Sequence, residues 1–327
     1  MKIVLLTGGQ GGLKLFEGLR ELVDPDSISM IVNTADNIWL LGLYIAPDVD
    51  SATYLTSGIL DTSRYWGITG DTFNAFSVIE QLTTESWFAL GDRDLAIHIV
   101  RTYMIKQGFR LTEVTRHICR ALGSRGVVIP MSDTHVETHL HTDLGDLHVQ
   151  EYLVRYAAKQ DPEKIKVSSI EYRGISDARA TPEALDAINS ADLIILGPSN
   201  PLLSISPILH TQGVRACIKR RREEGVPVVA VTPISRGRAF TGVAHVLLKH
   251  LGFEPTVYGV AELYSDIISS IVADSSEEEH LVNKIRGRLG VEVILAGIAM
   301  NTVWDKTALA QKLLSTVMSR RIMGGSS

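Results

Sequence analysis

The sequence predicts an α/β protein: a doubly wound, Rossmann-like parallel sheet with an inserted helical subdomain. Apolar runs such as 3–6 and 193–196 lack the polar alternation of a half-exposed strand, which is typical of strands covered on both faces. Segments with helical periodicity alternate with these runs over most of the chain, and this alternation indicates a parallel sheet. A glycine-rich turn joins the first run to the first helix. We therefore expect a Rossmann-like core over 1–56 and 123–323, a helical cap over 57–122 and a disordered tail over 324–327.

The turn after the first strand is the strongest local signal. It contains Gly8, Gly9, Gly11 and Gly12, and Lys14 follows one helical turn later. Glycine lets a backbone approach a phosphate closely, and the free N–H groups at a helix start point at such an anion. The dinucleotide fingerprint G-x-G-x-x-G fails, because Lys14 stands where its third glycine belongs, and the P-loop pattern fails as well. The turn predicts a phosphate site; the alternative is a tight turn without a ligand.

Acidic residues follow the second strand, expected over 28–32. Asp36 lies at the carboxyl end of this strand, where open α/β sheets place their ligands. Asp48 and Asp50 alternate, so in an extended chain they would lie on one side. Magnesium takes one or two carboxylates together with substrate phosphates, which makes Asp36 and Asp50 candidate Mg²⁺ ligands. The alternatives are an Asx turn at Asp36 and a chance pair of acids after a proline.

The expected cap, 57–122, has helical periodicity and unusual aromatic residues, among them Trp66. Asp94 and His98 are spaced i, i+4 and share a helix face, and Arg101 lies one step further on. A salt-bridged helix surface would explain these charges without a site. Trp39 stands before the cap in an apolar loop, where it could cover a flat ring or simply pack.

A second polar strand end follows the run 193–196. Gly197 stands there, followed by Ser199 and Asn200 between two prolines, and small hydroxyl and amide groups suit the phosphates or base edge of a nucleotide. Further along, 261–273 is expected to form an amphipathic helix and 291–298 the last strand. His139 and His141 could chelate a metal from one strand face, although their alternation with apolar residues favours a solvated antiparallel strand.

Composition limits the class of protein. The formal net charge of −5 gives no electrostatic reason to expect nucleic acid or an anionic membrane as a partner. With two cysteines, Cys119 and Cys217, a disulfide framework is excluded and a cytoplasmic location is expected. An apolar run long enough to span a bilayer is missing from the sequence, so no membrane association is expected.

Taken together, these motifs resemble one known family. The series T-G-G-x-G-G-x-K-L, V-N-T-A-D, P-D-V-D, G-D-R-D-L-A-x-H-x-x-R-T, P-M-S-D and G-P-S-N-P-x-x-S-I-x-P-I-L is similar, in the same order, to the 2-phospho-L-lactate transferase family of coenzyme F420 biosynthesis. The resemblance runs from Thr7 to the terminal helix. It implies transfer of a phospho-acid from a GDP-linked donor to the ribitol hydroxyl of the deazaflavin Fo, with Mg²⁺ as cofactor and GMP as leaving group.

The resemblance also implies roles for residues. We expect the donor to contact the glycine turn and the second strand end, that is Gly8, Gly9, Gly11, Gly12, Lys14, Gly197, Ser199 and Asn200. The acceptor would contact the cap and the loop before it through Trp39, Trp66, His98 and Arg101. Asp50 or Asp94 would hold or deprotonate the attacking hydroxyl. The family's members are often homodimers, which implies a homodimer here.

One departure from the family pattern stands out. Members commonly carry two acids after V-N-T-[AG], and here Asn37 takes the second place, so it offers an amide where a carboxylate would bind a metal or a proton. The acid carried by the donor (phospholactate, phosphoenolpyruvate or phosphoglycerate) is left open. Two other functions also stay open: a regulatory nucleotide-sugar-binding protein of related fold, and a nicotinamide dehydrogenase, which would need the fingerprint that fails.

Overall fold

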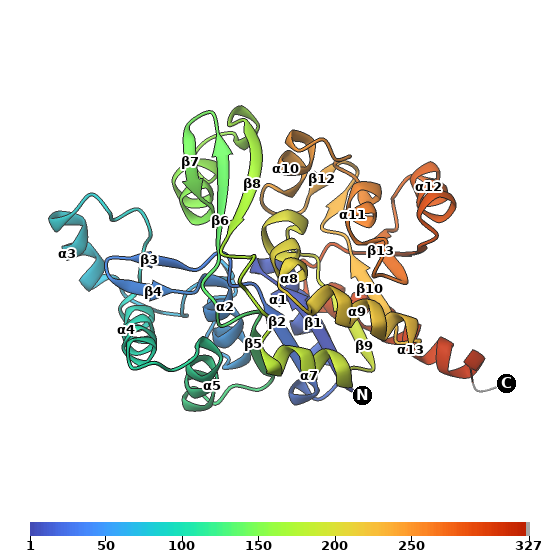
Figure 1. Ribbon diagram of the computed structural model, residues 1–327, viewed down its shortest axis with the longest axis horizontal. Coiled ribbons are helices and arrows are strands. Elements are labelled where there is room, and N and C mark those ends of the chain that lie inside the picture. Colours follow the sequence, from blue (N-terminus) through green and yellow to red (C-terminus); the bar gives the residue numbers. More distant parts are fainter. Residues whose placement is uncertain (325–327) are drawn as a thin grey trace.

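A computed structural model describes residues 1–324, with side chains as far as Ser315. Its centre is a seven-stranded sheet in the order β14-β13-β10-β9-β1-β2-β5, and every neighbouring pair is parallel (Figure 1). The predicted doubly wound α/β fold is thus confirmed. Its strands are β1 (Ile3–Thr7), β2 (Ile28–Val32), β5 (Val127–Pro130), β9 (Leu193–Leu196), β10 (Val228–Val231), β13 (Ser270–Asp274) and β14 (Glu292–Ala296).

The chain changes direction across the sheet next to β1. From β1 it proceeds through β2 to the edge strand β5, and it later returns to β9 on the other side of β1 and continues outward to β14. The carboxyl ends of β1 and β9 therefore form the topological switch point, which is where open α/β sheets bind their ligands. The two strand ends predicted as a site, the glycine turn after β1 and the segment with Gly197, Ser199 and Asn200 after β9, both lie at this point.

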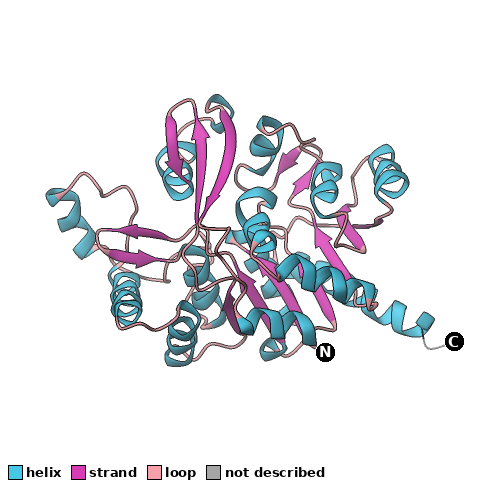
Figure 2. Ribbon diagram, viewed as in Figure 1, coloured by secondary structure: helices cyan, strands magenta, loops and turns pink. Residues whose placement is uncertain are grey.

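Both faces of the sheet are buried, as the apolar runs predict. In β1, Val4 and Leu6 pack into one core, whereas Ile3 and Leu5 pack into the core on the opposite face. Helices cover the two faces (Figure 2). The main helices are α1 (Gly9–Arg20), α2 (Pro47–Thr56), α3 (Asn74–Leu82), α4 (Asp92–Lys106), α5 (Leu111–Ala121), α7 (Pro182–Ser190), α9 (Val214–Glu223), α10 (Ala244–His250), α11 (Val257–Tyr264), α12 (Glu279–Leu289) and α13 (Val303–Gly324).

Two parts extend away from the central sheet in Figure 1. One is the hairpin of β3 (Ile38–Leu40) and β4 (Leu43–Ile45) with α3 and α4, and the other is an antiparallel sheet in the order β7-β6-β8. The strands of that sheet are β6 (Glu137–Thr142), β7 (Gly145–His148) and β8 (Val167–Arg173), so the interpretation of His139 and His141 as part of an antiparallel strand is confirmed. The boundaries of the cap, 57–122, remain a prediction. Its last helix, α5, packs on β5 and α2 of the core.

Short elements complete the chain. They are α6 (Val149–Glu151), α8 (Ser206–His210), the two-residue strands β11 (Ile234–Ser235) and β12 (Arg238–Ala239), the 3₁₀ turns at Pro25–Ser27 and Pro162–Lys164, and π-helical turns at Tyr152–Ala157 and Pro201–Ile205.

Three sequence predictions about local structure were wrong. Asp48 and Asp50 are not extended but lie in the first turn of α2, because Pro47 stands at the first helical position, where its fixed φ favours a helix. The helix expected over 261–273 ends at Tyr264, and β13 follows it, since a short apolar run does not by itself separate a buried strand from a helix. The predicted tail begins too early, because Gly324 belongs to α13, while 325–327 lie outside the described residues.

Helix α13 packs closely on α1, and Gly18 makes this contact possible. A Cβ at Gly18 would lie 2.1 Å from the carbonyl oxygen of Lys306. The separation is far below a van der Waals contact with a backbone atom that has little freedom to move. The absence of a side chain at Gly18 therefore sets the distance between the two helices.

We expect Gly18→Ala to lower the free energy of unfolding by about 1–3 kcal/mol, because α13 must shift to relieve the clash. The matched control is Gly287→Ala in α12, where a Cβ meets nothing within 4 Å. That change should be neutral or stabilise by up to about 1 kcal/mol, as alanine favours a helix. Urea unfolding of both variants tests the pair, and equal stabilities would contradict the role given to Gly18.

Candidate functional site

The glycine turn is held by two neighbouring segments. The Gly8 N–H donates to the Ser199 hydroxyl at 3.2 Å, and the Gly9 N–H donates to Oδ1 of Asp48 at 2.8 Å. Gly9 has φ +67°, a left-handed conformation that favours glycine. The turn from β1 into α1 is thus joined to the end of β9 on one side and to α2 on the other.

Two further glycines allow close backbone contacts. A Cβ at Gly11 would lie 1.9 Å from the carbonyl oxygen of Pro198, and a Cβ at Gly12 would lie 1.7 Å from Oγ1 of Thr7. The chain's own packing therefore requires glycine at both positions. The tight-turn interpretation explains these two residues, so a ligand is not needed to account for them.

A pocket opens at the switch point beside this turn. Gly11 and Lys14 line it from the start of α1, and Pro198 lines it from the segment after β9. The rest of its lining was not predicted from the sequence: Thr232, Pro233, Phe240, Thr241, Ile298, Met300 and Asn301. Thr232 and Asn301 follow β10 and β14, so their place after strands was a usable signal. Phe240 follows the two-residue strand β12, which leaves no recognisable pattern in the sequence.

Lys14 is the positive charge that faces this pocket. Burial lowers the pKa of its ammonium group, the nearby charge of Lys306 lowers it further, and Glu17 partly opposes both effects. Its ammonium lies 5.0 Å from the centre of the Tyr65 ring. Lys14 therefore offers a partly desolvated cation at the strand ends, which suits an anionic ligand.

Two carboxylates, Asp36 and Asp48, lie together at the end of β2. The amide nitrogen of Asn33 donates to Oδ1 of Asp36 at 2.7 Å and to Oδ2 of Asp48 at 3.0 Å, and the amide of Gln150 donates to Asp36 at 3.1 Å. Burial and the charge of Asp48 raise the pKa of Asp36 well above its usual value, and burial raises the pKa of Asp48 to about 6. Asn33 belongs to the V-N-T-A-D motif but was given no role there, and Gln150 had no signal in the sequence, since an amide is an ordinary polar residue until the fold places it.

Asp50 lies in a different, closed cluster. Both of its carboxylate oxygens accept hydrogen bonds from the Arg101 guanidinium, and Nδ1 of His98 lies 3.6 Å away. Nε2 of His98 lies 3.3 Å from Asp94, which also accepts a 2.5 Å hydrogen bond from the Tyr54 hydroxyl. His98 and Arg101 are each only 1% exposed. The helix-face spacing of Asp94, His98 and Arg101 was thus read correctly, but the face is buried against α2 and is no salt-bridged surface.

The two acidic groups differ in their fitness for a divalent cation. Asp50, Asp94 and His98 have ligand atoms within 4.8 Å of one another. Arg101 already neutralises Asp50, however, and a metal there would lie beside a buried guanidinium. Asp36 and Asp48 receive hydrogen bonds only from neutral donors, and a cation would relieve their mutual repulsion. Among the described residues this hard-oxygen pair suits Mg²⁺ best.

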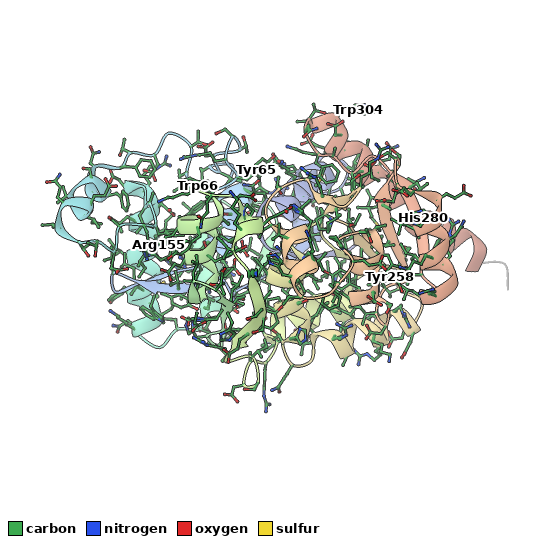
Figure 3. All side chains as sticks on the ribbon, turned by 90° about the horizontal axis from the view of Figure 1, so that it is seen from above. Tyr65, Trp66, Arg155, Tyr258, His280 and Trp304 are labelled. Carbon is green, nitrogen blue, oxygen red and sulfur yellow. The ribbon has the colours of Figure 1, made fainter. Side chains whose placement is uncertain are left out.

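The remaining predicted residues lie around these groups. The Asn200 side chain accepts from the N–H groups of Leu202 and Leu203 and so caps the following turn. Asn37 is buried, and its amide nitrogen donates to the Tyr44 hydroxyl at 3.1 Å. Trp39 and Trp66 are exposed, and Figure 3 shows Trp66 close to Tyr65. Trp39 contacts the Tyr44 ring, whereas the guanidinium of Arg64 lies over Trp66.

Comparison with known proteins identifies the family. The family described as 2-phospho-L-lactate transferase CofD matches residues 3–299 of the chain. The chain belongs to this family. A 2-phospho-L-lactate transferase of Methanospirillum hungatei JF-1 is 34% identical over 318 residues, which cover 97% of this chain and 99% of the relative. Another, of Methanocorpusculum labreanum, is 37% identical over 273 residues, 83% of this chain and 87% of that protein.

Solved structures support the fold. The crystal structure of a UPF0052 family protein from Bacillus halodurans matches with a TM-score of 0.58 at 18% identity, over 96% of this chain and 98% of that chain. This similarity shows the architecture alone. Within residues 1–324, none of the helices is both long and apolar enough to cross a membrane.

We expect Arg101→Met to lower the free energy of unfolding by about 3–5 kcal/mol, because it leaves Asp50 buried without a counter-charge. Arg93→Met on the exposed side of the same helix should change stability by no more than about 0.5 kcal/mol. The double variant Asp50→Asn/Arg101→Met should recover part of the loss. If Arg101→Met unfolds at the same urea concentration as the parent, the buried pair does not stabilise the fold.

Proposed function

We propose that this chain transfers a phospho-acid from a GDP-linked donor to the ribitol hydroxyl of the deazaflavin Fo in coenzyme F420 biosynthesis. The hydroxyl oxygen forms a bond to the donor's distal phosphorus, the bond from that phosphorus to the bridging oxygen breaks, GMP leaves, and the hydroxyl proton is lost. Membership of the family supports this reaction. The observation that carries it is the glycine turn at the switch point: Lys14 lines the pocket beside this turn, and the buried acid pair Asp36–Asp48 contacts the turn through Gly9.

The donor side consists of the two strand ends. Lys14 offers charge to the pyrophosphate, and the segment with Gly197, Ser199 and Asn200 faces the turn that carries Gly8, Gly9, Gly11 and Gly12. Ser199 already accepts from the Gly8 N–H, and Gly9 donates to Asp48. We propose that these contacts fix the turn, while Lys14 and the pocket beyond Pro198 receive the nucleotide.

A Mg²⁺ ion, when bound, would neutralise charge on the pyrophosphate and on the departing GMP. Of the predicted ligands, we retain Asp36. Asp48 replaces Asp50 as its partner in our proposal, because Asp48 shares Asn33 with Asp36 whereas Asp50 is paired with Arg101. The shared amide of Asn33 holds both carboxylates in a fixed orientation.

The acceptor side is assigned to the hairpin and the cap. Trp39 and Trp66 are two exposed aromatic side chains there, and we propose that they contact the deazaflavin ring. His98 and Arg101, predicted to bind the acceptor, are buried against Asp50, so we propose that they support the site from behind.

Asp94 is the better candidate than Asp50 to hold the attacking hydroxyl. Its side chain is 12% exposed, compared with 5% for Asp50, and Arg101 occupies both oxygens of Asp50. Burial alone would raise the pKa of Asp94, but His98, the Tyr54 hydroxyl and Arg101 together lower it. Asp94 is therefore an ionised hydrogen-bond acceptor that orients the hydroxyl, and a weak base.

The test is a Mg²⁺-dependent turnover assay with Fo, offering GDP-linked phospholactate, phosphoenolpyruvate and phosphoglycerate in parallel. We expect one donor to react with release of GMP, which would also identify the transferred acid. If Fo binds but none of the three donors reacts, Fo remains supported as the acceptor and these donors are ruled out. If a GDP-linked donor binds but Fo does not, a regulatory nucleotide-binding protein becomes the better interpretation. Light scattering on the same sample checks the homodimer implied by the family.

The metal assignment is tested by Asp48→Asn and Asp50→Asn. We expect Asp48→Asn to weaken Mg²⁺ binding by about 100-fold or more and to abolish transfer, because it removes one anionic ligand. It should also stabilise the metal-free protein, since the repulsion between Asp36 and Asp48 is gone. Asp50→Asn should keep Mg²⁺ and donor binding while transfer falls. Titration calorimetry with Mg²⁺ separates the two, and weaker Mg²⁺ binding in Asp50→Asn alone would restore Asp50 as the ligand.

A further inference from the structure

A second cluster of charges lies directly behind Lys14. The ammonium of Lys306, from α13, donates to Oε2 of Glu17 at 2.8 Å and to the Tyr65 hydroxyl at 2.7 Å. The Tyr65 hydroxyl in turn donates to the same Glu17 oxygen at 2.5 Å. Glu17 lies on α1, three residues after Lys14, so the cluster joins the first helix, the last helix and the loop before Ile68. None of these three residues belongs to the donor site described above.

The cluster is well buried and its geometry is enforced. The side chain of Lys306 is 9% exposed and that of Glu17 is 12% exposed. Tyr65 has φ +59°, a left-handed conformation that is strained for an aromatic residue. Gln10, in the glycine turn, donates to the carbonyl oxygen of the preceding residue, Arg64. Contacts from α1 and α13 therefore hold Tyr65 in place against its own backbone preference.

The contacts of Glu17 affect the direction in which the ammonium of Lys14 points. Lys14 and Glu17 are spaced i, i+3 on one helix, so an ion pair between them would form readily if Glu17 were free. Lys306 and Tyr65 occupy Oε2 of Glu17, and Arg20 lies 3.8 Å from Oε1. The pKa of Lys306 is raised, since its bonds to Glu17 and Tyr65 outweigh burial, so it stays a cation. Its charge repels Lys14, whose own side chain lines the switch-point pocket.

We propose that Lys306 is a positioning residue for the anionic donor: it occupies Glu17 and so directs the ammonium of Lys14 into the switch-point pocket. Lys306 itself does not line the pocket, and it acts through Lys14. Tyr65 completes the device by bridging Lys306 and Glu17. This inference rests on the proposed function only in the identity of the probe, GDP, which supplies the pyrophosphate that Lys14 would meet.

The experiment measures the Kd for GDP by titration calorimetry at fixed salt. Lys306→Met keeps the apolar stem but removes the charge, so Lys14 should turn to Glu17 and GDP affinity should fall about tenfold. Lys306→Arg should restore most of it. Glu17→Gln/Lys306→Met should also recover affinity, because Lys14 then has no carboxylate to pair with. A merely structural lysine would not give this second rescue. Lys312→Met, an exposed lysine on the same helix, is the matched control and should bind as the parent does.

The outcomes separate the two proposals. If the parent protein does not bind GDP, the proposed donor is wrong. If the parent binds GDP and Lys306→Met binds it equally well, the positioning role is wrong. A Lys306→Met protein that loses affinity but is not rescued by the second change at Glu17 would also overturn it, since packing of α13 on α1 would then be the cause. Thermal unfolding of each variant shows that the compared proteins are folded.

Discussion

The structure depends on how closely the β1–α1 turn approaches its neighbours. Gly11 and Gly12 let the backbone lie against Pro198 and Thr7 at separations that no side chain would permit. The same turn is tied to β9 by Ser199 and to α2 by Asp48. Because β1 and β9 flank the switch point, this contact brings the two polar strand ends together and leaves the pocket beside them. The proposed donor site therefore depends on the close contact between the β1–α1 turn and the segment after β9.

The charged groups around the switch point have three different kinds of partner. Asp50 is neutralised by Arg101 inside the protein, Asp36 and Asp48 share only neutral donors, and Lys14 has a neighbouring carboxylate that other groups already occupy. A buried ion pair mainly maintains structure, since opening it leaves a charge without a partner. A buried like-charged pair costs stability unless a cation joins it. These differences distinguish residues that support the fold from candidate ligands, although all of them are charged groups near the carboxyl ends of the strands.

The hairpin and α4 connect the cap to the same centre. Tyr44, on β4, accepts from Asn37, and its backbone N–H donates to Thr102 on α4. Arg101, the neighbour of Thr102, holds Asp50 on α2. These contacts therefore couple the cap to the first turn of α2, which carries Asp48. The amide of Asn37 thus has a structural partner in Tyr44, and the metal site that we propose at Asp36 and Asp48 does not require a carboxylate at position 37.

The sequence by itself determined the fold class and the family, and it predicted the strand ends to which we assign the donor site. Unbroken apolar runs that alternate with helical segments favour strands covered on both faces, and the motif series was long enough to identify the family. It did not determine the conformation at Asp48, where two acids spaced by one residue fit a strand or a helix start equally well. Nor did it determine partners: that Asn33 joins Asp36 to Asp48, that Arg101 faces Asp50, and that Lys306 reaches Glu17 across 289 residues. Tertiary structure decided these pairings, because side-chain partners depend on distances between segments that local sequence does not encode.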